Sequence, residues 1–283
     1  MQIFKTKNEI QAFVKQQKAE NRRIALVPTM GALHSGHLSL LDKAKENNTL
    51  TICSIFVNPT QFNDPKDLEK YPRPLENDIR LLEKAECDVL FLPDVQEMYP
   101  DKDEKWHIDL GSLDQIWEGA NRPGHFQGVT QVVYKLFTII EPDVACFGQK
   151  DFQQVMVVQR LIDSKQLPVT LIICPIIRDE KGLALSSRNV RLSETGKTKA
   201  LVLSRALTLI KEGFQEQSFA ALLSQAKALI AGEGDVELEY LAICETTTLM
   251  ETERIEPNQN YVALIVAWID GVRLIDNMLL NNN

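Results

Sequence analysis

Two histidines three residues apart are the strongest candidates for chemistry in this chain. His34 and His37 enclose Ser35 and Gly36, between the apolar run 24–27 and a segment whose leucines recur at helical spacing. Residues three apart in the first turn of a helix share a face, so the two imidazoles can direct N–H groups at one phosphate. A strand, a glycine turn and a helix N-terminus also favour an anion, through unpaired backbone N–H groups and the helix dipole. The sequence therefore predicts a phosphate site here, with Ser35 as a possible helix cap.

Other interpretations of this turn fit the sequence less well. Gly31 and Gly36 have the glycine spacing of a P-loop, but His37-Leu38 stands where that motif requires Lys-Ser/Thr. The dinucleotide fingerprint G-x-G-x-x-G is absent, which argues against a dehydrogenase. A metal site would need a third ligand, which no neighbouring residue in the sequence supplies. The remaining alternative is that both histidines only cap or pack the helix.

A second polar string, Ser186-Ser187-Arg188-Asn189, follows an apolar stretch in the second half of the chain. Two hydroxyls and a guanidinium suit an anion, because arginine can bind phosphate through two parallel hydrogen bonds. The same string is equally typical of an ordinary loop that starts a helix. On its own it is therefore a weaker signal than the histidine pair.

The segments that must position these groups alternate between strands and helices. Apolar runs bounded by proline or polar turns predict the strands, and the intervening segments carry apolar residues at helical spacing. This order is typical of a doubly wound parallel sheet, in which ligands bind at the carboxyl ends of the strands. The His34–His37 turn and the Asn58–Phe62 loop both follow such ends. The predicted strands are 24–27, 51–57, 89–92, 144–147 and 169–173.

The pattern changes near residue 176. Two amphipathic helices come first, and three strand-like runs follow, at 237–244, 261–268 and 272–275. Asp270-Gly271 is a hairpin turn signal between the last two. We therefore predict an α/β chain with two domains. Residues 1–176 form a Rossmann-like, doubly wound parallel sheet, and residues 177–283 form a smaller C-terminal α+β domain.

The composition limits the classes of function. The chain has 283 residues, 44% of them hydrophobic, and a net charge of −8, which argues against a broad nucleic-acid surface. The N-terminus lacks the apolar core of a signal peptide, and no window reaches the roughly 18 apolar residues of a membrane helix. The five cysteines lack metal-ligand spacing and are expected to be reduced, buried packing residues. These features predict a cytoplasmic enzyme without nucleic-acid or membrane partners.

The motifs together resemble those of a known family. His34-Ser35-Gly36-His37 is similar to the HIGH motif of the nucleotidyltransferase superfamily, and the serine-rich string takes the place of its second, KMSKS-type motif. In their order and spacing, longer strings resemble the pantoate–beta-alanine ligase family over nearly the whole chain. These strings are Pro28-Thr29-Met30-Gly31-Ala32-Leu33-His34, Phe56-Val57-Asn58-Pro59-Thr60-Gln61-Phe62, Tyr71-Pro72-Arg73, Arg122-Pro123-Gly124-His125-Phe126, Lys150-Asp151-Phe152-Gln153-Gln154, the run from Gly182 to Asn189, and Arg273-Leu274-Ile275-Asp276-Asn277.

The resemblance implies an ATP-dependent ligation in two steps. Pantoate attacks the α-phosphate of ATP to give pantoyl adenylate and pyrophosphate, and the amine of β-alanine then attacks the acyl carbon to give pantothenate and AMP. It also implies a homodimer and a C-terminal domain that moves over the site. Mg²⁺ is expected on the ATP phosphates, with its protein ligands unassigned. The alternatives are a nucleotidyltransferase that adenylylates a phosphate-bearing acceptor and a nucleotide-binding regulatory protein with an inactive site.

The resemblance also assigns the site residues. Four residues that donate to phosphate would be catalytic: His34, His37, Lys150 and Arg188. Among them, His37 would be the proton donor. Two amide side chains, Gln61 and Gln154, would bind pantoate, and Gln61 would also contribute to the β-alanine site. The ATP-binding residues would be Met30, Gly31, Ala32, Leu33, His34, Ser35, Gly36, His37, Gly148, Gln149, Lys150, Asp151, Ile177, Leu185, Ser186, Ser187 and Arg188.

One position departs from the family pattern. Gln149 stands where the family usually carries a glutamate, so the length is kept and the charge is lost. A neutral neighbour would leave Lys150 freer to bind phosphate, and we expect activity to survive. The alternative for Lys150 is a solvated surface lysine. The alkyl part of pantoate needs an apolar wall, for which Phe56 and Phe62 are candidates.

Three further positions have simpler interpretations. Asp78 lies in an acidic helical segment and is expected on a solvated face rather than at a metal. His125 can serve the site or merely cap and pack a helix. Asp151 and Gln154 have the spacing of a capping box, so the Gln154 side chain could bond to the backbone instead of pantoate.

Overall fold

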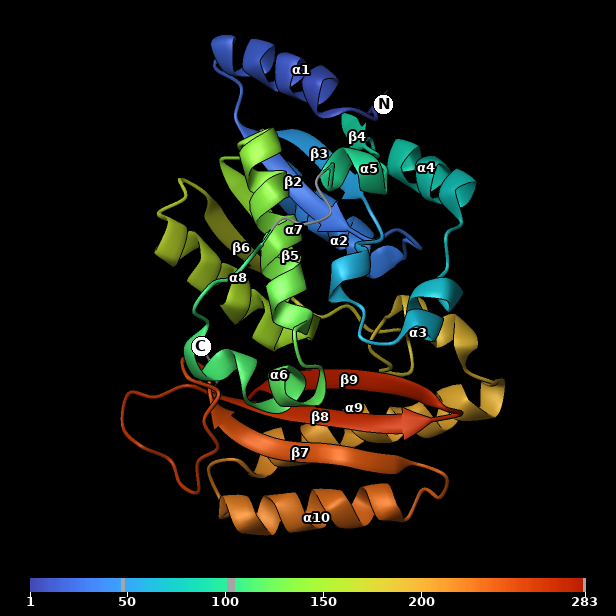
Figure 1. Cartoon of the computed structure of the whole chain (residues 1–283). Helices are drawn as coiled ribbons and strands as arrows, with labels where there is room; N and C mark the ends of the chain where they lie inside the picture. The colour runs from blue at the N-terminus through green and yellow to red at the C-terminus, as the bar shows by residue number, and fades with distance from the viewer. Residues whose placement is uncertain (47–48, 101–104, 282–283) are drawn as a thin grey trace. The chain divides into compact units, whose positions relative to one another are not determined.

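The computed structural model describes residues 1–46, 49–100 and 105–281, and the chain divides into two compact units (Figure 1). The first unit comprises Met1–Gln149 and Gln153–Pro175. The second comprises Lys150–Phe152 and Ile176–Asn283. Within the described ranges, no helix is long and apolar enough to cross a membrane.

The first unit is built on a parallel sheet of six strands in the order β1-β4-β3-β2-β5-β6. The chain runs from β2 outward to β3 and β4 on one side, and β5 and β6 lie on the other. The order therefore reverses between β2 and β5, which is where such sheets bind ligands. The strands are β1 (Gln2–Phe4), β2 (Ile24–Thr29), β3 (Leu50–Ile55), β4 (Val89–Phe91), β5 (Val144–Gly148) and β6 (Thr170–Cys174).

Helices follow the strands in sequence, as the alternating pattern predicted. The α-helices are α1 (Lys7–Ala19), α2 (Ser35–Lys45), α3 (Pro65–Lys70), α4 (Leu75–Lys84), α5 (Val95–Met98), α6 (Trp117–Asn121), α7 (His125–Ile140) and α8 (Phe152–Lys165). Short 3₁₀ turns are η1 (Pro59–Gln61), η2 (Gly111–Asp114) and η3 (Gln149–Asp151). Leu41 of α2 and Leu82 of α4 join strand residues such as Val27 and Cys146 in one buried apolar cluster. This cluster holds α2 against the sheet.

The second unit is a three-stranded antiparallel sheet with two long helices. The order is β7-β8-β9, and Asp270 and Gly271, both with positive φ, make the tight turn between β8 and β9. Figure 1 shows α9 and α10 along the sheet, and their apolar residues form one core with the strands. The elements are η4 (Ser187–Arg191), α9 (Glu194–Gly213), α10 (Phe219–Ala231), β7 (Glu237–Glu245), β8 (Tyr261–Ile269) and β9 (Val272–Leu279). The predicted fold class, a doubly wound parallel sheet with a smaller α+β part, is confirmed.

Candidate active site

The histidine turn leaves the carboxyl end of β2 through two residues with left-handed backbone. Gly31 has φ +78° and Ala32 has φ +50°. A Cβ on Gly31 would lie 3.0 Å from Asp78 Oδ2 and 3.1 Å from Ile55 Cγ2, so the turn requires glycine there. Ala32 carries a Cβ in this region at a cost on the order of 1–3 kcal/mol, which the surrounding contacts must offset.

Asp78 supplies those contacts. Its carboxylate accepts the backbone N–H groups of Ala32 and Leu33, both at 2.8 Å, and the residue is only 1% exposed. Burial raises the pKa of the Asp78 carboxyl above its ordinary value, and the two N–H donors partly offset the rise. The prediction of a solvated face was wrong. A signal was present, because Leu82 lies four residues on, on the same face of α4, and is also buried.

Most backbone N–H groups of the turn are already bonded within the protein. Gly31 N–H donates to Thr29 Oγ1 at 3.1 Å, and the N–H groups of His37 and Leu38 donate to the His34 carbonyl. The N-cap of α2 is His34, whose Nδ1 accepts from Gly36 N–H at 3.2 Å, and Ser35 is the first helical residue. The expectation of a Ser35 cap was therefore wrong. The turn does not present the open row of backbone donors that the sequence predicted.

The two imidazoles lie side by side, as the spacing predicted. Their ring centroids are 4.1 Å apart. His34 Nδ1 accepts from Gly36 N–H, and His37 Nδ1 accepts from His34 N–H at 3.3 Å. A neutral imidazole has one acceptor and one donor nitrogen, so these bonds assign the proton to Nε2 in both rings. Both histidines cap the helix through Nδ1, and each carries its N–H on Nε2.

Gln61, the first predicted pantoate residue, lies in a turn held by α7. His125 Nδ1 donates to the Gln61 carbonyl at 2.8 Å, and Arg122 Nη1 lies 3.1 Å from His125 Nε2. Because the carbonyl only accepts, the His125 proton is on Nδ1 and Nε2 accepts from Arg122. A Cβ on Gly128 of α7 would lie 2.4 Å from the Thr60 carbonyl, so glycine permits this close approach. His125 packs the helix and also fixes the Gln61 backbone.

The Gln61 side chain is oriented by two neighbours. Its Oε1 accepts from Asn58 Nδ2 at 3.1 Å, and its Nε2 donates to Met30 Sδ at 3.3 Å. Asn58 is 1% exposed and also accepts the Tyr99 hydroxyl at 2.8 Å. An amide offers two N–H groups and two lone pairs, so one of each remains for a ligand. Met30 thus joins the histidine turn to the Gln61 turn, which sequence spacing did not reveal.

The other candidate residues of the first unit lie in α8, next to Tyr99 and at the end of β5. Gln154 is half-buried in α8. Its neighbour Gln153 is 4% exposed and bonds to Glu118 N–H and to the Leu113 carbonyl, so it is a structural glutamine that the sequence did not distinguish. Phe56 is buried against Tyr99, with ring centroids 6.2 Å apart. Gly148 ends β5, and Gln149 follows it.

The remaining candidates belong to the second unit. Ser186 caps η4 by accepting Arg188 N–H at 3.2 Å, so the serine string does start a helical turn, while its hydroxyl proton stays available. A cavity of about 10 Å³, enough for about one water, is lined by Lys150, Ser186 and the buried, unpartnered Asn189 Oδ1 among other groups. It brings Lys150 next to the serine string. Half-buried positions are taken by Ile177, Leu185, Ser187 and Arg188, and Asp151 is exposed.

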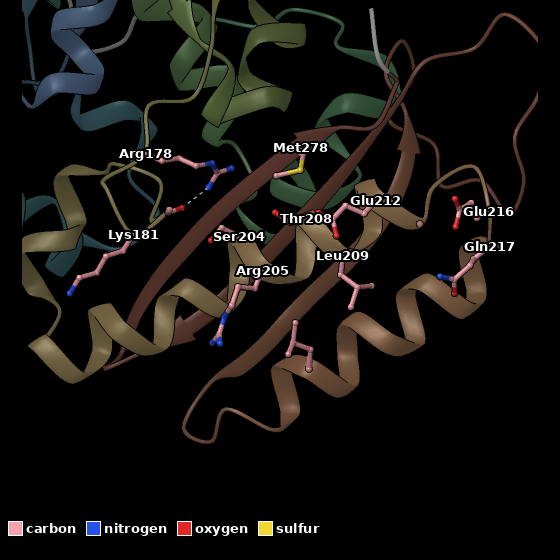
Figure 2. A pocket seen from close by; sticks show the side chains of 13 residues that line it. Arg178, Lys181, Ser204, Arg205, Thr208, Leu209, Glu212, Glu216, Gln217 and Met278 are labelled. Carbon is pink, nitrogen blue, oxygen red and sulfur yellow. Dashed lines mark hydrogen bonds between the residues drawn. The ribbon is translucent and has the colours of Figure 1, made fainter.

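A larger groove of about 720 Å³ opens elsewhere on the second unit (Figure 2). Arg205 and Glu212 of α9 line it together with Met278 of β9, so both signs of charge are present. None of the predicted site residues lines this groove. Because the lining carries both signs of charge, it does not indicate one class of ligand.

Metal-binding groups do not cluster in the part of the chain that the structure describes. Within residues 1–46, 49–100 and 105–281, no three side chains of His, Cys, Asp or Glu are placed to share an ion. Each of the five cysteines is a free, buried thiol. Asp78, the most buried carboxylate near the histidines, is committed to backbone N–H groups.

A doubly wound sheet with paired imidazole donors at its switch point is the arrangement of an α/β nucleotide-binding enzyme. Comparison with known proteins identifies the family. The model of the pantoate-beta-alanine ligase family matches residues 2–279. The chain therefore belongs to the pantoate–beta-alanine ligase family, which confirms the resemblance drawn from the motifs and makes it an enzyme of the ligase class.

Relatives match over the whole length. A pantothenate synthetase of Cytophaga hutchinsonii is 46% identical over 274 residues, covering 96% of each chain. The crystal structure of pantothenate synthetase from Thermus thermophilus is similar with a TM-score of 0.93 and 39% identity, covering 100% of both chains. The pantoate-beta-alanine ligase of Francisella tularensis, complexed with beta-gamma ATP and beta-alanine, is similar with a TM-score of 0.81 and 34% identity, covering 100% of this chain and 99% of that one.

Substituting Asp78 by asparagine tests its hold on the turn. Asn keeps the shape but faces one backbone N–H with an NH₂ group, so we expect at least about a tenfold loss of adenylation activity. Because burial raises the folded-state pKa of Asp78, its stabilising contribution relative to Asn is greatest below the unfolded pKa and falls as pH rises through the folded pKa. Urea unfolding of both proteins from about pH 4 to about pH 8 measures this difference.

The control is Glu76→Gln, an exposed acid on the same helix. Glu76→Gln should leave both the adenylation activity and the pH dependence of the free energy of unfolding unchanged. A stability difference between wild type and Asp78→Asn that stayed constant or grew with pH would contradict the raised pKa, and unchanged adenylation activity in Asp78→Asn would contradict the role of Asp78 in holding the turn.

Proposed function

We propose that this chain joins pantoate to β-alanine in an ATP-dependent ligation through a pantoyl adenylate. The observation that carries the proposal is the full-length family match together with two Nε2–H donors at the switch point of the sheet. The Francisella tularensis relative, complexed with beta-gamma ATP and beta-alanine, supports ATP and β-alanine as ligands.

The first step makes the acid reactive. A pantoate carboxylate oxygen attacks the α-phosphorus of ATP, the bond from that phosphorus to the bridging oxygen breaks, and pyrophosphate leaves with the electron pair. Negative charge accumulates on the phosphoryl oxygens and on the leaving group, so fixed N–H donors lower the barrier. His34 and His37 are such donors, and His37 is the proton donor in this proposal.

The second step forms the amide. The β-alanine amine attacks the acyl carbon of the adenylate, the acyl–oxygen bond breaks, and AMP leaves while the nitrogen loses a proton. We infer this step from membership of the family. The resemblance assigns Gln61 to the β-alanine site as well as to pantoate, and its amide, held by Asn58 and Met30, keeps one donor and one acceptor.

We assign ATP binding to residues of both units. In the first unit these are Met30, Gly31, Ala32, Leu33, His34, Ser35, Gly36, His37, Gly148 and Gln149. In the second they are Lys150, Asp151, Ile177, Leu185, Ser186, Ser187 and Arg188. Ala32 and Leu33 can only shape the site, because Asp78 takes their N–H groups. Lys150 and Arg188 supply the positive charge for the phosphates, with His34 and His37 as directed donors.

The pantoate site is assigned to Gln61 and Gln154. Pantoate offers a carboxylate and two hydroxyls, and an amide can pair with a hydroxyl as donor and as acceptor. Phe56, which is 6% exposed, and Phe62, in edge-to-face contact with Tyr71 at 5.7 Å, supply apolar surface for the alkyl part.

Mg²⁺ is proposed as the partner of the ATP phosphates. The described carboxylates do not gather into a metal cage, and Mg²⁺ in nucleotide sites usually keeps water and phosphate ligands. Its role would be to neutralise charge on the triphosphate, and we assign it no protein ligand.

A homodimer in the cytoplasm completes the proposal. β6 is an edge strand of the parallel sheet, and its residue Ile173 is 51% exposed. An exposed apolar edge strand is a surface that proteins usually cover, which supports association. The free thiols are typical of a reducing compartment.

Isotope exchange tests the function directly. With ATP, pantoate and labelled pyrophosphate but no β-alanine, we expect label to enter ATP. A nucleotidyltransferase acting on another acceptor would give no pantoate-dependent exchange. Exchange that ignored pantoate, or no pantothenate with all three substrates present, would exclude the proposed reaction.

Two substitutions separate the roles of the His37 nitrogens. In His37→Asn the side chain can still accept from the His34 N–H at the Nδ1 position but has lost the outer donor. We expect adenylation to fall roughly 10²- to 10³-fold, the usual effect of removing one transition-state donor. His37→Gln places an N–H near the Nε2 position and should retain more of the activity. Single-turnover adenylation measures both, and equal activity in wild type and His37→Asn would reassign His37 to a structural role.

Gln61→Ala should affect the two substrates differently. Losing the amide removes a bond to pantoate, so we expect KM for pantoate to rise about tenfold or more while KM for ATP changes little. Steady-state kinetics with each substrate varied provide the measurement, and exposed Gln159→Ala on α8 is the matched control. Equal losses for pantoate and ATP would contradict the assignment of Gln61.

A further inference from the structure

One string that carries the family resemblance has no role in the reaction proposed above. Arg273-Leu274-Ile275-Asp276-Asn277 lies on β9, an edge strand of the second unit's sheet. Asp276 and Asn277 are polar, yet they are only 5% and 2% exposed. Buried polar groups need hydrogen-bond partners, so the partners of these two side chains indicate their structural roles.

Asp276 holds the hairpin that leads into the serine string. Its carboxylate accepts two bonds from the Arg178 guanidinium, at 2.6 and 2.9 Å. Arg178 also donates to the Gly182 carbonyl at 3.2 Å, and Figure 2 shows its side chain extending from its loop with this bond dashed. Arg178 forms a β-bridge with Ala184 as well. The backbone just before Ser186 is therefore tied to β9.

Asn277 holds the Lys150 turn. Its Nδ2 donates to the Lys150 carbonyl at 2.9 Å, and its backbone N–H donates to Asp276 Oδ1 at 2.8 Å. Successive side chains on a strand point to opposite faces, so two adjacent residues can reach two different segments. One strand thus bonds to the hairpin before the serine string and to the Lys150 turn.

We propose that Asp276 and Asn277 are positioning residues that hold Lys150 and the Ser186–Arg188 loop in register with each other from one strand. This inference rests on the proposed function, because it assumes that both segments bind the ATP phosphates. The proposal assigns neither side chain a contact with ATP. Each fixes a backbone segment, and the Asp276 charge is paired with Arg178, so it does not compete with phosphate for Lys150.

A double-mutant cycle tests whether Asn277 positions Lys150. The variants are Asn277→Ala, Lys150→Ala and the combination, and kcat/KM for ATP is measured by pantoate-dependent pyrophosphate exchange. Losing one buried hydrogen bond predicts about a tenfold decrease for Asn277→Ala in the wild-type background. If Asn277 acts through Lys150, the same substitution should cost less than about twofold once Lys150 is Ala.

The control is Tyr261→Phe in the same unit. Tyr261 is fully buried, and its hydroxyl accepts the Glu256 N–H at 2.6 Å, so this variant loses a buried bond remote from Lys150. It should lower the urea midpoint and leave kcat/KM unchanged in both backgrounds. Equal costs of Asn277→Ala with and without Lys150 would overturn the proposal.

Whether Asp276 positions the Ser186–Arg188 loop is tested in the same way, with Asp276→Asn and Arg188→Ala. We expect Asp276→Asn to raise KM for ATP about tenfold alone and to add little when Arg188 is Ala. Additive effects of the two substitutions on KM for ATP would overturn the positioning role of Asp276. If Asp276→Asn does not fold, the Asn277 cycle alone decides the proposal. Wild-type exchange that does not depend on pantoate would refute the proposed function instead, so the two failures are distinguishable.

Discussion

The turn at the carboxyl end of β2 depends on one buried carboxylate. Asp78 accepts the N–H groups of Ala32 and Leu33, and this pair of bonds stabilises the turn in which Gly31 and Ala32 have left-handed backbone. Without the carboxylate, each unsatisfied donor would cost about 1–3 kcal/mol. Asp78 thus occupies the position that a phosphate takes in a loop that binds anions through its backbone. An anionic ligand must then be bound by side chains that follow the turn.

This constraint explains why a histidine, His37, stands where a P-loop has its lysine. The cap bonds to Nδ1 of His34 and of His37 fix each ring and leave the proton on Nε2. The two donors are therefore preorganised before any ligand arrives, which is the condition under which hydrogen bonds stabilise developing charge most effectively. A flexible lysine at the same place would have to be ordered during the reaction, at a cost in side-chain entropy.

The sheet and the histidine pair could be predicted from the sequence because their signals are local. Apolar runs and helical spacing placed the strands and helices, and three-residue spacing placed the two rings side by side. Asp78 was misjudged because its partners lie 45 and 46 residues earlier in the chain, and an acidic segment usually indicates solvent. Gln153 and Gln154 are adjacent and identical in type, so only the packing shows that Gln153 is structural. The partner of Asn277 is 127 residues away.

Three remote residues act in the same way, through the backbone of a functional position. Asp78 bonds to N–H groups of the histidine turn, His125 to the Gln61 carbonyl at 2.8 Å, and Asn277 to the Lys150 carbonyl at 2.9 Å. Bonds of this kind fix the backbone and leave the functional side chain able to pair with a ligand. The bond that sets the Lys150 backbone comes from Asn277 on β9, so the position of this backbone does not depend on a charge at Gln149.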